Sequence, residues 1–233
     1  MVWEDNVVYA GKMWRAAVLV LGLGLLTGCD MMQEDDWTPR EEAAISIDEE
    51  GRITEYLSEK LDQAYYNFDE LKSMLDSEVA DYNARHGDGS VTVVTAEQEE
   101  GKANLVIEYR SGADYAEFNN IEFYYGSMIN AQLSGYLFDV SYKQVNDGVV
   151  QVEEVSGSEV LKKMADQVVV VRAPLEVHVP GNIDFMSSNA NALGSNVVLA
   201  VGTGNEDSAK SVVTASEEER EAMNRVYIVF EEK

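Results

Sequence analysis

The strongest hydrophobic pattern in the chain is a stripe of apolar side chains between residues 50 and 85. These side chains follow one another in steps of three or four: Ile53, Leu57, Leu61, Ala64, Phe68, Leu71, Leu75, Val79 and Tyr82. Steps of that size place side chains on one face of an α-helix. Gly87 stands just beyond the stripe, and glycine commonly follows the last turn of a helix. The pattern predicts one long amphipathic helix from Glu50 to Arg85 that packs against a sheet.

Much of the remaining chain consists of short runs rich in Val, Ile and Thr, which favour β-strands. The predicted strands cover residues 90–96, 103–110, 137–145, 149–155, 167–172, 175–179, 183–186, 196–201 and 225–230. Asn146-Asp147-Gly148 predicts a tight hairpin turn, because Asp-Gly tolerates the positive φ angles that such a turn requires. Strands that follow one another so closely favour a mostly antiparallel sheet.

Two further segments predict helices. Residues 113–135 carry a broad apolar face, although Gly126 interrupts it, and residues 158–165 predict a short helix. A long N-terminal helix packed on a mostly antiparallel sheet, with a second helix beside it, amounts to an α+β fold. We expect this fold to form a single domain over residues 47–233.

The N-terminal part of the chain shows a different pattern. An apolar run of eleven residues, Ala16 to Leu26, follows the cations Lys12 and Arg15 and is closed by Thr27-Gly28-Cys29. As a helix, this run would be about 16 Å long, roughly half of the ~30 Å hydrocarbon core of a bilayer. Cations before a short apolar run that ends in small residues are typical of a signal peptide. We therefore predict a signal peptide over residues 1–28.

The segment between this run and the predicted domain is polar. Residues 29–46 carry a net negative charge, contain Pro39 and show no hydrophobic period. Such a segment has too little apolar surface to form a core of its own, so it is interpreted as a tether. The first residue of the protein stays open between Met1 and Met13, because residues 1–11 contain two acidic residues and no cation.

The sequence Leu26-Thr27-Gly28-Cys29 resembles the lipobox of bacterial lipoproteins. The resemblance implies that the Cys29 thiol receives a thioether-linked diacylglycerol and that Cys29 becomes the first residue after cleavage. Two acyl chains hold a protein stably on a bilayer, whereas one chain does so only marginally. The alternative is an ordinary buried cysteine, but Cys29 is the only cysteine and directly follows the apolar run. We therefore expect anchoring to the bilayer through Cys29, at the extracytoplasmic face of the cell membrane.

A second resemblance concerns the predicted domain. Residues 105–126 read L-V-I-E-Y-R-S-G-A-D-Y-A-E-F-N-N-I-E-F-Y-Y-G, and residues 225–230 read R-V-Y-I-V-F. Both segments are similar to a group of uncharacterised lipoproteins from clostridia-type Gram-positive anaerobes. The resemblance implies a location on the outer face of a single-membrane cell, and it implies no enzymatic activity.

The charge of the chain restricts its partners. The chain contains 43 acidic and 17 basic residues, with a formal net charge of −26. The predicted signal peptide holds two residues of each sign, so its removal leaves the net charge unchanged. Nucleic-acid binding depends on Lys and Arg that neutralise phosphates, which excludes nucleic acid as a partner. The charge also argues against a basic patch on anionic lipid; it mainly indicates solubility and repulsion at a crowded surface.

Candidate catalytic residues are few. His178 lies between valines in a predicted strand and close to Glu176, and a histidine with a carboxylate could act as an acid–base pair. His86 stands at the end of the predicted long helix, where it could interact with the helix dipole. Both positions more often belong to ordinary structural histidines, and the motifs G-x-S-x-G, S-x-x-K and H-E-x-x-H are absent. With one cysteine and two histidines, a zinc-type site is not expected either. We therefore predict no catalytic, cofactor-binding or metal site.

Two other groups of residues have both a structural and a functional interpretation. Gly202-Thr203-Gly204 follows an apolar run, as in a dinucleotide-binding turn, but acidic residues follow where the pyrophosphate would bind, so a loop is favoured. A group of aromatic side chains could stack on sugars or form the core between helix and sheet, and the core is favoured. This group comprises Phe118, Phe123, Tyr124, Tyr125, Tyr136, Phe138 and Tyr142.

Together these features favour a diacylglycerol-anchored lipoprotein that binds an envelope protein or a small ligand. A solute-binding lipoprotein of a transporter is one alternative, and it would need two lobes around a cleft. An envelope hydrolase is the other alternative, and it would need a nucleophile activated by a neighbouring base.

Overall fold

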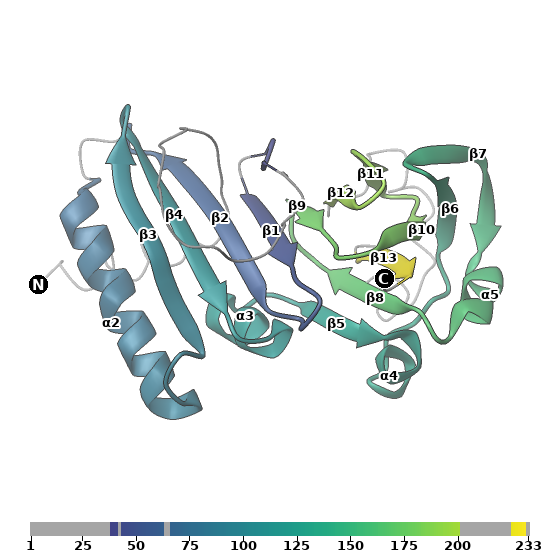
Figure 1. Cartoon of the computed structure of the whole chain (residues 1–233), viewed down its shortest axis with the longest axis horizontal. Helices are drawn as coiled ribbons and strands as arrows, with labels where there is room; N and C mark the ends of the chain where they lie inside the picture. Colours follow the sequence, from purple (N-terminus) through teal and green to yellow (C-terminus); the bar gives the residue numbers. More distant parts are fainter. Residues whose placement is uncertain (1–37, 42, 63–65, 201–224, 232–233) are drawn as a thin grey trace, which may run out of the picture.

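The computed structural model describes residues 38–41, 43–62, 66–200 and 225–231, and Figure 1 shows the arrangement of their helices and strands. Thirteen strands form two sheets in this part of the chain. The described helical segments are α2 (Phe68–His86), α3 (Gly112–Asn119), α4 (Met128–Leu133), α5 (Gly157–Val160) and a 3-10 helix (Leu161–Lys163). The described fold is therefore mostly β, and the prediction of an α+β fold with a long N-terminal helix is wrong.

The seven-stranded sheet has the strand order β11-β12-β9-β1-β2-β4-β3. Its neighbouring strands pair antiparallel, except that β1 and β9 run parallel. Its strands are β1 (Ala43–Ile47), β2 (Ile53–Lys60), β3 (Val91–Glu99), β4 (Lys102–Tyr109), β9 (Leu175–His178), β11 (Ala190–Ala192) and β12 (Val197–Ala200).

The six-stranded sheet has the order β5-β8-β13-β10-β6-β7, and all its pairs are antiparallel. Its strands are β5 (Phe123–Ser127), β6 (Ser141–Asn146), β7 (Val149–Ser156), β8 (Gln167–Val171), β10 (Asn182–Ser187) and β13 (Val226–Glu231). The chain passes from this sheet to the seven-stranded sheet between β8 and β9, so strands that are close in sequence belong to different sheets.

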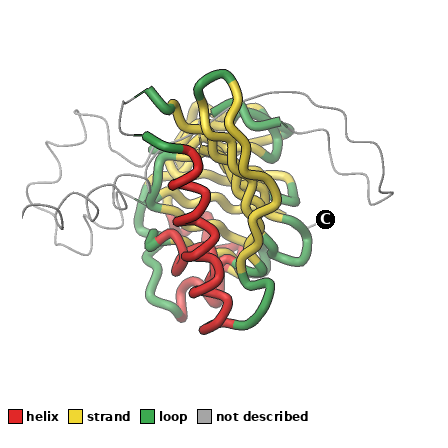
Figure 2. The backbone as a smooth tube through the Cα atoms, turned by 90° about the vertical axis from the view of Figure 1, so that its left-hand side faces the viewer, coloured by secondary structure: helices red, strands yellow, loops and turns green. Residues whose placement is uncertain are grey.

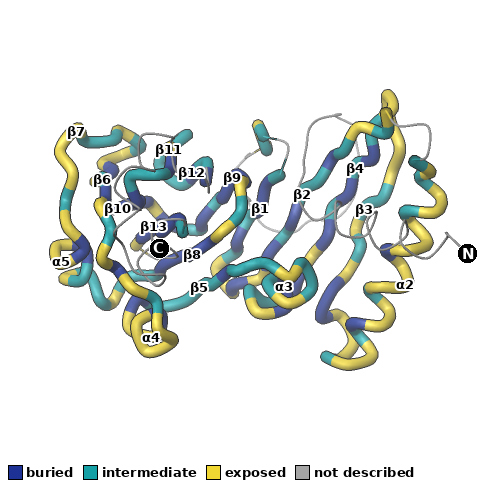
Figure 3. Tube along the Cα trace, turned by 180° about the vertical axis from the view of Figure 1, so that it is seen from behind, coloured by how far each residue is buried: buried dark blue, intermediate teal, exposed yellow. Residues whose placement is uncertain are grey.

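The central strands β8 and β13 of the six-stranded sheet are buried on both faces. Along β8, Val169 and Val171 belong to a core that includes side chains of both sheets, because alternate side chains of a strand point to opposite faces. Val168 and Val170 point to the opposite face and belong to a second core, which also contains Met128 of α4. Figure 3 shows this burial as dark blue along β8, whereas β7 at the end of the sheet is largely exposed.

Helix α2 runs alongside β3 at the end of the seven-stranded sheet, and Figure 2 shows it from that end. Its buried side chains Leu75 and Tyr82 join the core that the two sheets share. The side chain of Asn67 accepts hydrogen bonds from the first backbone N–H groups of α2, as a helix N-cap does. Gly87 ends the helix with a φ of 103°, which glycine adopts readily.

The segment that was predicted as one helix from Glu50 to Arg85 forms a strand followed by a shorter helix. Ile53–Lys60 forms β2, and only Phe68–His86 is helical. Ile53 and Leu57 are four residues apart, and that spacing places two side chains on one face of a strand as well as of a helix. The stripe of apolar residues was therefore compatible with both structures over its first part, and pairing with β1 and β4 made this part a strand.

The predicted helix over residues 113–135 is also wrong. This segment forms α3, then β5, then α4. Helix α3 ends at Asn119, because the next residue, Asn120, has a φ of 50° in the left-handed region, and Ser127 caps the start of α4. Between them, β5 pairs with β8, so its backbone bonds to a neighbouring strand and not within a helix.

Other local predictions are confirmed. Residues 91–109 form the predicted hairpin of β3 and β4. Asp147 and Gly148 turn between β6 and β7 with φ angles of 47° and 78°, as Asp-Gly predicts. The predicted tether over residues 29–46 overlaps β1, whose residues Ala44 and Ile45 are buried, so the folded part begins earlier in the chain than predicted.

Candidate functional site

One cluster of polar side chains surrounds His178 on the seven-stranded sheet. The Nδ1 atom of His178 lies 3.0 Å from the Ser46 hydroxyl, and its Nε2 atom lies 2.8 Å from the Asn196 amide nitrogen. The register produces this arrangement, because Ser46 on β1 stands directly opposite His178 on β9. All three side chains are half-buried. The sequence separates Ser46 from His178 by 132 residues, and the parallel pairing of β1 and β9 brings them together.

The hydrogen bonds of His178 define its chemistry. The Asn196 amide donates to Nε2, so a neutral ring carries its hydrogen on Nδ1 and donates it to the Ser46 hydroxyl oxygen. A ring in this form does not accept the proton of Ser46, as the base of a catalytic triad must. Ser46 also lies within a strand that is paired on both sides, so ladder bonds occupy the neighbouring backbone N–H groups that an oxyanion hole would need. The cluster is suited to hydrogen bonding, not to acyl transfer.

Glu176 lies on the same face of β9, two residues before His178, and is fully buried. Its carboxylate accepts hydrogen bonds from the backbone N–H groups of Arg40 and Glu41, at 2.9 and 3.1 Å. The guanidinium of Arg40 donates to the backbone oxygen of Leu193. Glu176 therefore holds the segment before β1 in place, while His178 bonds to other side chains. These contacts do not form the acid–base pair of His178 and Glu176 that the sequence suggested.

A second polar cluster lies inside the core that the two sheets share. Glu55 in β2 is 6% exposed and has the apolar residues Ile45 and Ile107 opposite it on β1 and β4. The Tyr109 hydroxyl donates a hydrogen bond of 2.5 Å to its carboxyl group. The hydroxyl of Tyr115 in α3 bonds to the same carboxyl.

Asn119 completes this cluster from the last turn of α3. Its amide donates to the Tyr109 hydroxyl and to the Tyr115 backbone oxygen, both at 3.1 Å. Burial raises the pKa of Glu55 to about 7, although the hydrogen bonds from Tyr109, Tyr115 and Asn119 lower it. Burial also raises the pKa of both tyrosines well above its ordinary value. The buried cluster can therefore exchange a proton near neutral pH, but its carboxyl is too enclosed to contact a substrate.

Neighbouring polar contacts connect α2 with α3. The Tyr82 hydroxyl donates to the Asp114 carboxylate at 3.2 Å, and the Ser111 hydroxyl donates to the same carboxylate at 2.6 Å. His86 stacks on Tyr82 with ring centroids 4.1 Å apart, and its Nε2 atom lies 3.1 Å from the Glu117 carboxylate. His86 is the last residue of α2, as its predicted place at a helix end implied.

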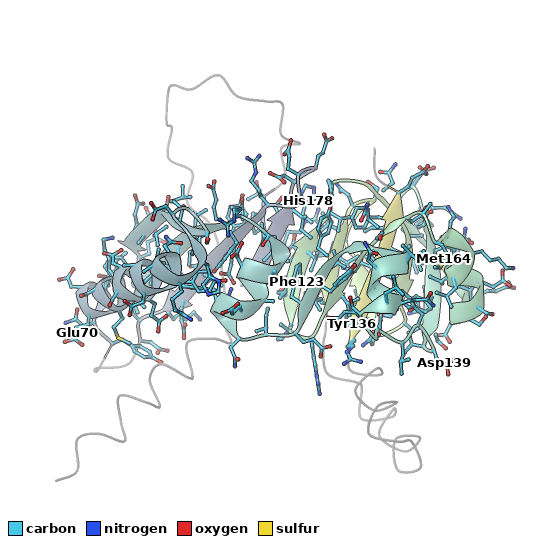
Figure 4. The ribbon with its side chains drawn as sticks, turned by 90° about the horizontal axis from the view of Figure 1, so that it is seen from below. Glu70, Phe123, Tyr136, Asp139, Met164 and His178 are labelled. Carbon is cyan, nitrogen blue, oxygen red and sulfur yellow. The ribbon has the colours of Figure 1, made fainter. Side chains whose placement is uncertain are left out.

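The aromatic residues that could have stacked on sugars form core, as favoured from the sequence. Phe123, Phe138 and Tyr142 are buried, and the other members of the group pack against one of the two cores. Figure 4 labels Phe123 and Tyr136 of this group, and in that view His178 lies on the opposite side of the molecule from Tyr136. Tyr136 therefore lies away from the His178 cluster.

The remaining predicted sites lie outside the described residues. These are the lipidation site Cys29 and the glycines of Gly202-Thr203-Gly204. Within the described ranges, no group of three or more His, Cys, Asp or Glu side chains could hold a metal ion. None of the helices in those ranges has the length and hydrophobicity to cross a membrane.

Glu55, Ser46 and Asn196 were not predicted as site residues from the sequence. Glu55 had a usable signal, because an alternating pattern Ile53-x-Glu55-x-Leu57 places a carboxyl on the apolar face of a strand. Ser46 and Asn196 had no such signal, since only long-range pairing brings them to His178.

Comparison of the chain with protein-family models, with curated proteins and with solved structures finds no match.

Proposed function

We propose that this protein is a diacylglycerol-anchored lipoprotein that acts by binding at the extracytoplasmic face of the cell membrane. The observation that carries the proposal is the order of residues 12–29: cations, an apolar run of eleven residues, then Leu26-Thr27-Gly28-Cys29. Each part of this order has a role in export or in lipid attachment. The net charge of −26 argues against contact with anionic lipid through a basic patch, so the acyl chains would make the membrane contact.

The start of the folded part supports a position close to the bilayer. The backbone of Arg40 is bonded to Glu176, which is fully buried in the domain. Ten residues separate Cys29 from Arg40, and at ~3.6 Å per residue they reach at most about 40 Å. An anchored domain would thus act on partners at or near the membrane surface.

A binding role is supported by the chemistry of the His178 cluster. Ser46, His178 and Asn196 are half-buried on one face of the seven-stranded sheet and exchange hydrogen bonds with one another. Such groups can bind a polar ligand or the backbone of a partner protein, and the net charge of −26 favours neutral or basic partners.

Neither alternative has comparable support. A transporter-type solute receptor closes two lobes around its ligand, whereas the two sheets here share one continuous core. A hydrolase would need the Ser46 hydroxyl to donate its proton to His178, and the hydrogen bonds of His178 run the other way.

Membrane fractionation of cells that express the full chain tests the proposal. Wild type should sediment with membranes and move to the detergent phase after solubilisation with a phase-separating detergent. The control variant Cys29→Ala keeps the apolar run but lacks the thiol that accepts lipid, so it should fail to incorporate a radiolabelled fatty acid. Equal incorporation by the two proteins, or none by either, would contradict the proposal.

A further inference from the structure

Two buried oxygen atoms on the seven-stranded sheet have no hydrogen-bond partner in the described part of the chain. They are the Ser58 hydroxyl oxygen on β2 and the Asn104 side-chain oxygen on β4. Ser58 is only 5% exposed, and it stands directly opposite Asn104 in the register of the two strands. Buried polar atoms are nearly always hydrogen-bonded. Two neighbouring unpaired oxygens therefore indicate a place where a hydrogen-bonding ligand would be stabilised.

These oxygens lie on the face of the sheet that points away from the core shared by the two sheets. Ile53 on β2 points into that core, and Ser58, five residues later, points to the opposite face because side chains of a strand alternate. Ser46 pairs with Thr54, four residues before Ser58. The His178 cluster therefore shares this face, about 13 Å away along β2 at ~3.3 Å per residue.

Glu97 adds a carboxylate to the two oxygens. It stands directly opposite Asn104 on β3, so Ser58, Asn104 and Glu97 form one row across three neighbouring strands (Figure 1). Neighbouring strands are about 4.8 Å apart, so one ligand group can reach adjacent members of the row. The next row holds Lys60 and Lys102, and neither forms an ion pair with Glu97 in the described ranges. Glu97 itself is exposed.

All three members of the row can accept hydrogen bonds. A hydroxyl and an amide oxygen accept from N–H groups, and a carboxylate also supplies the negative charge that pairs with a cation. A guanidinium presents several N–H donors in a fixed planar fork, which suits adjacent acceptors better than the single ammonium of lysine does. Asn104 is half-buried and its amide turns about one bond, so its oxygen can face a group that enters past Glu97.

We propose that Ser58, Asn104 and Glu97 bind an arginine side chain of a basic partner segment. The guanidinium pairs with the Glu97 carboxylate and donates to the oxygens of Asn104 and Ser58. The net charge of −26 attracts such a segment over a distance. The inference rests on the proposed function, because it takes the protein as one that binds a partner. It uses neither the lipid anchor nor the His178 cluster.

Fluorescence anisotropy with the full chain in an uncharged detergent tests the site. The probe is a labelled peptide of alternating arginine and glycine, and a second peptide with lysine in place of arginine should bind more weakly. Glu97→Gln and Asn104→Leu should each weaken binding of the arginine peptide about tenfold. The matched control Glu108→Gln removes another exposed carboxylate from the same face and changes the net charge equally, so it should weaken binding less than about twofold.

Thermal unfolding of Asn104→Leu distinguishes this site from a structural role. Removal of an unpaired buried oxygen should leave the unfolding midpoint unchanged or raise it. A lower midpoint with unchanged peptide binding would mean that the oxygen bonds a structural water only, and it would overturn the proposal. Glu97 is exposed, so Glu97→Gln remains a test even where Asn104→Leu folds poorly.

Three results of the binding experiment would also overturn the site. Wild type could bind neither peptide, or Glu97→Gln and Glu108→Gln could weaken binding equally, which would reduce the effect to general charge attraction. Unchanged binding in both Glu97→Gln and Asn104→Leu would place the contact elsewhere, such as at the His178 cluster, and would leave the proposed function standing. Failure of Cys29 to accept lipid would remove the anchor without changing peptide binding, so the two proposals fail separately.

Discussion

Tyr109 donates a hydrogen bond of 2.5 Å to Glu55 inside the core that the two sheets share. The hydroxyl in turn accepts a hydrogen bond from Asn119, so one tyrosine connects a buried carboxyl of β2 with the end of α3. Hydrogen bonds donated by Tyr109, Tyr115 and Asn119 offset part of the cost of burying this acid. Three predictions follow from this pair of residues and from the other buried carboxyl, Glu176.

The stability of the protein should fall as the pH rises, because of Glu55. Its pKa is about 7 in the folded protein and 4.5 as the ordinary value. Because the folded protein holds the Glu55 proton more tightly than the unfolded chain does, protonation stabilises the fold. This stabilisation is complete below pH 4.5 and is lost as the pH rises through 7. The full difference is about 3 kcal/mol at ~1.4 kcal/mol per pKa unit.

The variant Glu55→Gln should remove this dependence. Its free energy of unfolding in urea should differ little between pH 5.5 and pH 8.5, and at pH 8.5 it should exceed that of wild type. If wild type and Glu55→Gln show the same dependence of stability on pH, Glu55 does not titrate near pH 7 in the folded protein.

Tyr109→Phe should destabilise the protein by about 1–3 kcal/mol, because it removes a hydroxyl that donates to Glu55 and accepts from Asn119. Tyr142→Phe is a matched control. The Tyr142 hydroxyl is also buried, but it has no hydrogen-bond partner among the described residues, so its removal should be neutral or stabilising. Urea unfolding at pH 6 compares the two variants, and equal losses of stability would contradict the network.

Glu176→Ala should destabilise the segment that precedes β1. The substitution leaves the backbone N–H groups of Arg40 and Glu41 without their acceptor, at an expected cost of about 1–3 kcal/mol. Glu108→Ala changes an exposed carboxylate on β4 of the same sheet and should change stability by less than about 0.5 kcal/mol. Thermal unfolding of both variants measures the difference, and similar midpoints would show that Glu176 does not hold the segment.

The tautomer of His178 distinguishes binding from hydrolysis. The Asn196 amide donates to Nε2, so nitrogen NMR of the neutral imidazole should find the ring hydrogen on Nδ1. The Asn196→Ala variant removes that donor and should shift the tautomer. A hydrogen on Nε2 in wild type would mean that Ser46 donates to the ring, and Ser46 would then have to be tested as a nucleophile.

Local signals in the sequence predicted local structure well. The turn at Asp147-Gly148 and the hairpin of β3 and β4 depend on neighbouring residues, and both are present. The amphipathic stripe was correct over α2, where Leu75 and Tyr82 are buried. It was wrong over β2, because a step of four residues fits one face of a strand as well as a helix.

The arrangement of the sheets could not be predicted from such signals. β1 pairs with β9 across more than 130 residues, and that pairing alone brings Ser46 to His178. The buried carboxyl of Glu55 depends in the same way on β4 and α3. The predicted helix over residues 113–135 failed for a related reason, since pairing of β5 with β8 replaced the helical bonds of its middle part.

The intact mass of the protein extracted from membranes decides whether Cys29 carries the proposed lipid anchor. In a Gram-positive host, we expect a chain that begins at Cys29 and is heavier by one diacylglycerol, and the Cys29→Ala variant should lack that species. An unmodified wild-type chain that still carries residues 1–28 would rule out the lipid anchor.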